Sequence, residues 1–80
     1  MKVKSYLIET AVADNIIFEV GFFEGVLAAL GITDYDKGYF TASFRSYTFV
    51  TTEENDALIT KICTEKEIHF RKANVEIRLS

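Results

Sequence analysis

The sequence contains a single cysteine, so this 80-residue chain cannot close an intramolecular disulfide and must hold its fold by other means. A chain of this length buries only about 60–65% of its unfolded surface, near the lower limit for folding without a disulfide or a metal. Apolar residues make up 49% of the chain and aromatic residues 14%, and each aromatic side chain buries a large area. We therefore expect one small domain over residues 1–80 with an aromatic-rich core, rather than a disordered chain or a disulfide scaffold.

The charge pattern disfavours two classes of partner. The formal net charge is −3, and the excess of acidic side chains lies in residues 1–40. A net charge of this size gives no strong attraction to nucleic acid or to an anionic membrane surface. No stretch of about 18 residues is free of charge, and the N-terminal segment lacks the apolar run of a secretory signal. We therefore expect a cytoplasmic protein without a membrane partner, which also suits a single reduced cysteine.

The first third of the chain predicts a strand and then an ambiguous apolar segment. Residues 2–10 are rich in β-forming side chains, and a turn is expected at residues 13–15. The next residues fit either one long helix beginning at Asp14, or a strand over Ile16–Val20 followed by a shorter helix from Phe22. The long helix would be apolar on nearly every side, which a small domain could hardly bury. We therefore favour the strand and the shorter helix.

A glycine marks the end of this first helix. Gly31 follows the last apolar position of the helical pattern, and glycine is the commonest left-handed residue just past a helix. Ile32 is then placed to contact Leu27, as the residue after such a glycine often does.

A second helix is predicted from about Glu53 to Lys66. Thr51, followed three residues later by Glu54, is a capping-box pattern, and the acidic side chains of the first turn suit the positive end of a helix dipole. The apolar stripe that we expect to be buried consists of Leu58, Ile59, Ile62 and Cys63.

The strongest strand signal is the segment Tyr39–Thr52, which predicts a strand or a tight hairpin. Because successive side chains of a strand point to opposite faces, two sets are expected. The first set includes Tyr39, Arg45, Tyr47 and Phe49, and the second Phe40, Ala42, Phe44, Thr48 and Val50. Residues 68–79 predict a last strand in which Val75, Ile77 and Leu79 share one face.

These elements predict an α+β fold, in which an antiparallel sheet of four to five strands carries two helices on one face. If Ile16–Val20 is helical instead, the order of elements becomes βαββαβ, the ferredoxin-like arrangement. This arrangement is the alternative fold.

Part of the segment Lys37–Phe44 resembles the RNP1 octapeptide of RNA-recognition motif domains. Four residues match that pattern: Lys37, Gly38, Tyr39 and Phe44. Three depart from it: Phe40, Thr41, which replaces the central stacking aromatic, and Ala42. The resemblance implies single-stranded nucleic-acid binding through an aromatic sheet face, with Tyr39, Phe44, Arg45 and Tyr47 at the bases and Arg71 and Lys72 at phosphates. This is the alternative function, and the acidic net charge of the chain disfavours nucleic acid as a partner.

The remaining candidate residues form no pattern that is typical of a metal-binding or catalytic site. Asp34 opens a segment like a calcium loop, but its twelfth position is Arg45, where a carboxylate is required. Cys63 lies on the apolar stripe of the second predicted helix, so a nucleophile–base pair with His69 is disfavoured. Glu9, Glu19 and Glu24 show no sign of converging. We expect a protein that is not an enzyme and that binds no metal or cofactor.

The aromatic and arginine side chains on one face of the central strand are the candidate partner-binding residues. If helices cover only one side of the sheet, we expect Tyr39, Arg45, Tyr47 and Phe49 on the open side, since tyrosine and arginine are enriched in protein interfaces. The sequence thus predicts an interaction module that blocks or adapts a larger intracellular protein. It is similar in type to phage-encoded inhibitors of host defence such as anti-CRISPR proteins. A homodimer through the same face is a competing expectation.

Overall fold

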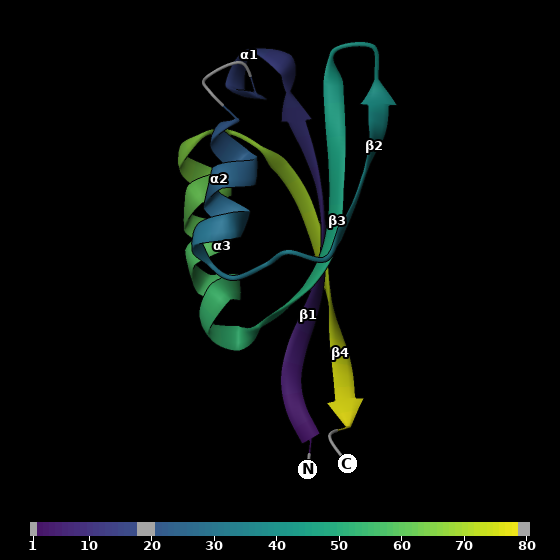
Figure 1. The fold of residues 1–80 in the computed structure, drawn as a ribbon, viewed down its shortest axis with the longest axis vertical. Helices are drawn as coiled ribbons and strands as arrows, with labels where there is room; N and C mark the ends of the chain where they lie inside the picture. Colours follow the sequence, from purple (N-terminus) through teal and green to yellow (C-terminus); the bar gives the residue numbers. More distant parts are fainter. Residues whose placement is uncertain (1, 18–20, 79–80) are drawn as a thin grey trace.

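Four antiparallel strands form one sheet, and two helices lie against one of its faces (Figure 1). The computed structural model describes residues 2–17 and 21–78. The strands are β1 (Lys2–Ala13), β2 (Tyr35–Thr41), β3 (Phe44–Thr52) and β4 (His69–Arg78), in the spatial order β2-β3-β1-β4. The helices on the sheet are α2 (Phe22–Ala29) and α3 (Glu53–Glu65). The expected α+β fold is therefore confirmed.

The segment after β1 is helical, which gives the βαββαβ order that the sequence left as the alternative. Asp14–Ile17 forms a short helix, α1, so the strand favoured over Ile16–Val20 is wrong at its first two residues; residues 18–20 lie outside the described part of the chain. The chain turns out of the sheet at Asp14, whose N–H donates to the carbonyl oxygen of Ser43 at 2.9 Å.

The helix from Phe22 is confirmed, and a left-handed glycine precedes it. Gly21 has a φ of 61° and stands directly before α2. An uninterrupted α-helix excludes this backbone conformation, so the long helix that would be apolar on every side does not form. The sequence argument against that long helix was correct. The structure interrupts it with a left-handed glycine at Gly21 and not with a strand at Ile16.

The segment Tyr39–Thr52 contributes to a hairpin of β2 and β3. The strands are joined by a turn at residues 42–43, in which the N–H of Ser43 donates to Oγ1 of Thr41. The pairing of β2 with β3 is irregular between Tyr39 and Thr41, whereas β4 pairs with β1 without a break from Lys2–Arg78 to Ala11–His69. The edge strand β2 is therefore the less regular of the two edges.

The core lies between the sheet and the helices α2 and α3. Its fully buried side chains come from two central strands and both helices: Ile8, Val12, Phe23, Leu27, Tyr47, Ile59 and Cys63. The ring centroid of Phe23 lies 5.1 Å from that of Tyr47 and 6.3 Å from that of Phe49. These tilted aromatic contacts join α2 to β3, whereas most other described core residues are aliphatic.

Both helices end in the same motif. At the end of α2, Gly31 is left-handed, its N–H donates to the carbonyl of Ala28, and the N–H of Ile32 donates to the carbonyl of Leu27 at 2.8 Å. This pair of bonds is the Schellman motif, which confirms the predicted end. At the end of α3 the left-handed residue is Glu67, with a φ of 55°. The following residue, Ile68, donates its N–H to the carbonyl of Cys63 at 2.8 Å.

The start and the buried side of α3 differ in detail from the prediction. The capping residue is Thr52 rather than Thr51, because Oγ1 of Thr52 accepts the N–H of Asn55 at 3.3 Å. Ile59 and Cys63 are buried as expected, but Leu58 is 49% exposed. Asp56 lies on the buried side instead, where the Lys72 ammonium of β4 pairs with its carboxylate at 3.0 Å. The buried side of α3 therefore includes a charged residue that is paired with the sheet, which the pattern of apolar residues could not predict.

Replacing Ile59 by alanine should lower the free energy of unfolding by roughly 2–5 kcal/mol, because it leaves a cavity under α3. Leu58→Ala is the matched control one residue away, and it should change this free energy by less than about 1 kcal/mol. Urea unfolding measures both. Equal losses for the two variants would show that α3 presents a different side to the sheet.

Replacing Glu67 by glycine should raise the free energy of unfolding by about 0.5–1 kcal/mol, because glycine adopts the left-handed conformation without the Cβ clash. The converse substitution, Gly31→Ala, places a Cβ on a left-handed residue and should lower the free energy of unfolding by about 1 kcal/mol. Thermal unfolding checks both variants, and a stabilising Gly31→Ala substitution would contradict the assigned helix ends.

Candidate functional site

Two of the four expected partner-binding residues lie in the core. Tyr47 is 0% exposed and Phe49 2%, and both face α2 and α3 rather than the open side of the sheet. The expectation that they form an open face is therefore wrong. The side chains of β3 were divided correctly between the two faces of the strand, but the helices cover the face that carries Tyr47 and Phe49, which was expected to be open. The physical reason is bulk: the larger aromatic set gains more from burial than the set that contains Ser46, Thr48 and Val50.

The buried hydroxyl of Tyr47 is accommodated because a helix supplies a carboxylate for it. Glu24 on α2 accepts hydrogen bonds from the Tyr47 hydroxyl at 2.8 Å, the Lys37 ammonium at 3.0 Å and the Tyr35 hydroxyl at 3.4 Å. These donors, Tyr47 first and Lys37 second, hold the pKa of Glu24 below its ordinary value despite partial burial. Burial, followed by the bond to Glu24, raises the pKa of Tyr47, so the phenol keeps its proton and remains a donor. This cluster ties the β2–β3 hairpin to α2.

The other two expected residues, Tyr39 and Arg45, meet near the end of the hairpin. The Arg45 guanidinium lies over the Tyr39 ring, 4.6 Å from its centroid, and also 3.3 Å from Oδ1 of Asp14. That carboxylate oxygen is buried and accepts no hydrogen bond from the described residues, so the nearby Arg45 guanidinium is what compensates its negative charge. Tyr39 is largely exposed. A cation–π pair held by an ion pair thus leaves one exposed aromatic ring at the sheet edge.

The open face of the sheet is built from rows of side chains that the strand register places side by side. In one row Leu7 of β1 lies between Val50 of β3 and Ala73 of β4. Leu7 is 38% exposed and Val50 43%, so this row is an apolar strip across three strands. In the next row Glu9 of β1 and Arg71 of β4 are directly opposite and form an ion pair. This face therefore presents apolar and neutralised charged groups together.

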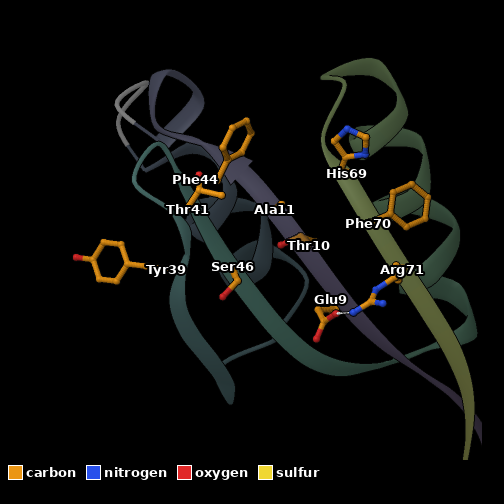
Figure 2. Close-up of a pocket in the computed structure, with 10 residues that line it drawn as sticks. All are labelled: Glu9, Thr10, Ala11, Tyr39, Thr41, Phe44, Ser46, His69, Phe70 and Arg71. Atoms are coloured by element: carbon orange, nitrogen blue, oxygen red, sulfur yellow. Dashed lines mark hydrogen bonds and ion pairs between the residues drawn. The ribbon is translucent and has the colours of Figure 1, made fainter.

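Beyond the ion pair the open face is hollowed. The hollow has a volume of about 780 Å³, and Ala11 of β1 lies at its floor because alanine fills little space. In Figure 2, Phe44 and Ser46 of β3 stand on one side of Ala11 and His69 of β4 on the other, while Glu9 and Arg71 close one end. The Tyr39 ring points away from the hollow at the sheet edge. The hollow is therefore a shallow site with an aromatic wall, a hydroxyl and an imidazole.

The sequence pattern did indicate part of this site, although the other face of the strand was expected to be open. Phe44 and Val50 were assigned to one face of the strand, and that face is the open one. Glu9, His69 and Arg71 come from strands distant in the sequence, so only the register brings them together. Ala11 carries no chemical signal of its own, and its role as a floor depends on larger neighbours on both adjacent strands.

The other candidates considered from the sequence are not assembled into a site. Cys63 is buried on the helix side of the sheet, where burial raises its pKa to about 11, whereas His69 lines the hollow on the opposite side. Asp34 directly precedes β2, and no cluster of three metal-binding side chains occurs among the described residues. Residues 37–41 of the RNP1-like segment lie on the edge strand β2, and 42–43 form the turn. No described helix is long and apolar enough to cross a membrane.

Comparison with protein-family models, curated proteins and solved structures finds no match for this chain.

The Glu24 cluster predicts a loss of stability in acid. Because the pKa of Glu24 is lowered in the folded state, its contribution is present above the ordinary value of 4.5 and is lost as pH falls through the folded value. Glu24→Gln should therefore be less stable than the wild type at neutral pH and show a smaller loss in acid. Urea midpoints across this pH range measure the effect, and parallel pH profiles for the two proteins would contradict it.

Proposed function

We propose that this chain is a non-enzymatic interaction module that binds a larger intracellular protein through the open face of its sheet and blocks or adapts that protein. The observation that supports this proposal most directly is the exposed apolar strip of Leu7, Val50 and Ala73 beside the hollow over Ala11. Apolar side chains that lie next to one another on an open face mark interaction surfaces in small soluble domains. The proposed contact residues are Leu7, Phe44, Ser46, His69 and Val50, with Tyr39 at the edge.

The chemistry of the open face favours protein over nucleic acid. Arg71, which a phosphate contact would use, is already paired with Glu9. Lys72 is paired with Asp56, and it lies over the Tyr6 ring on the helix side. Stacking of successive bases needs several aromatic faces along the central strands, but the described open-face positions of β1 and β3 hold a single aromatic ring, Phe44. An apolar strip with a neutral ion pair instead suits a protein surface.

A photo-crosslinking amino acid at Ser46, inside the hollow, should capture the partner in cells that produce the protein. The same group at Leu58, exposed on the helix side, is the matched control. We expect an adduct with a larger protein from position 46 that survives nuclease, and little from position 58. An adduct only from position 58, a nuclease-sensitive adduct, or an adduct with a second copy of this chain would each contradict the proposal.

Replacing Phe44 by alanine should weaken partner binding by about 1–3 kcal/mol, because this ring forms one wall of the hollow. Leu58→Ala should leave binding unchanged. Titration of the captured partner with each variant measures the affinities, and circular dichroism confirms folding. Equal affinities for wild type and the Phe44 variant would remove the hollow from the interface.

A further inference from the structure

We propose that the outer edge of β4 binds an extended segment of the partner protein, which joins the sheet as an additional strand. This inference rests on the proposed function and names the conformation of the partner segment. β4 is an edge strand, and no described strand lies beyond it (Figure 1). The main-chain groups on its outer side therefore have no strand partner among the described residues.

The register identifies which main-chain groups of β4 point outward. The N–H of Asp14 donates to the carbonyl oxygen of Ser43, which continues the β1–β3 ladder and places the even-numbered residues of β1 toward β3. Because successive residues of a strand direct their main-chain groups to opposite sides, the odd-numbered residues of β1 bond to β4, and their partners include Arg71 and Ala73. The residues of β4 whose N–H and C=O groups point outward are then the even-numbered ones, which include Phe70, Lys72 and Asn74.

The two edges of the sheet differ in how they are protected against pairing. The pairing of β2 with β3 is irregular between Tyr39 and Thr41, and a bulge of this kind turns an edge away from a further strand. β4 pairs with β1 without a break and contains neither glycine nor proline. An exposed lysine can also block an edge, but Lys72 is held on the helix side by its ion pair with Asp56. β4 is therefore the edge that an additional strand can join.

This edge is continuous with the proposed interface. His69, Phe70 and Arg71 of β4 line the hollow over Ala11 (Figure 2). Segments that add to a sheet edge gain main-chain hydrogen bonds from the edge and side-chain contacts from the pockets beside it. A partner that fills the hollow thus reaches the outward-facing groups of Phe70, and the next such groups follow at every second residue of β4.

The charge of β4 complements an acidic segment. The Arg71 side chain is 85% exposed and contacts Glu9 through one nitrogen. Its other guanidinium nitrogens make no hydrogen bond within the described part of the chain, so they are available to a second carboxylate. We expect an aspartate or glutamate of the segment next to Arg71 on the open face. The sequence of β4 contains more basic than acidic residues, so an acidic segment complements it better than a second copy of β4 does.

A photo-crosslinking amino acid at Asn74 identifies the segment in cells, and a synthetic peptide of that segment is then the probe. Amide hydrogen exchange in the free protein should be fast at the outward-facing Phe70, Lys72 and Asn74 and slow at the inward-facing Arg71 and Ala73. The peptide should slow exchange at the outward-facing positions.

Two variants at position 74 separate the main chain from the side chain. Asn74→Pro removes an outward N–H without removing a bond to β1, which edge strands tolerate. It should weaken peptide binding at least about fivefold, whereas Asn74→Ala, which keeps the N–H, should change binding less than about twofold. Circular dichroism confirms that both variants fold.

The inference is wrong if both variants bind the peptide equally, if the peptide slows exchange at none of the outward-facing positions, or if position 74 crosslinks to a second copy of this chain or to nothing. The crosslink from position 46 separates these failures from failure of the proposed function. A larger protein captured from position 46 but not from position 74 leaves the proposed function standing and removes the edge. Capture from position 74 alone removes the open face from the interface.

Discussion

The burial of Tyr47 against α2 is the contact on which the rest of the structure depends. Its ring packs on Phe23, and its hydroxyl reaches Glu24 on the same helix. Because a tyrosine in a core needs a partner for its hydroxyl, this pair of contacts fixes both the side of β3 that α2 covers and the position of the helix along the strand. Once Tyr47 and Phe49 face inward, strand alternation leaves Ser46, Thr48 and Val50 on the open side. The candidate site is a consequence of this choice.

Local signals in the sequence were sufficient for most elements of the fold. Gly31 and Ile32 identified the end of α2 correctly, and Phe22 its beginning, because caps and turns depend on neighbouring residues alone. A helix beginning at Asp14 was one of the two alternatives, but the strand over Ile16–Val20 was favoured, because apolar residues in a short segment suit a strand or a helix equally well. The N–H of Asp14 and its carboxylate are held by Ser43 and Arg45, which are distant in the sequence.

The candidate site was harder to predict because it depends on which face is covered. Tyr39, Arg45, Tyr47 and Phe49 look like interface residues by type, and the same bulk and aromatic character suit a core. The deciding partners, Phe23 and Glu24, lie on another element, so the strand itself could not indicate the covered side. The exposure of Leu58 in α3 could not be predicted for the same reason. The buried side of that helix includes Asp56, whose ion-pair partner Lys72 lies on another element. The hollow over Ala11 could be predicted only from the register of three strands, β3, β1 and β4.

The assignment of the two faces is the central claim, and thiol labelling of adjacent residues on β3 tests it most directly. Cysteine is placed at Val50, on the open face, or at Thr51, on the covered face, in a chain whose own Cys63 is buried. The structure predicts rapid labelling at position 50 under native conditions and protection at position 51 until the protein unfolds. Protection at position 50 with rapid labelling at position 51 would reverse the faces and remove both the hollow and the proposed interface.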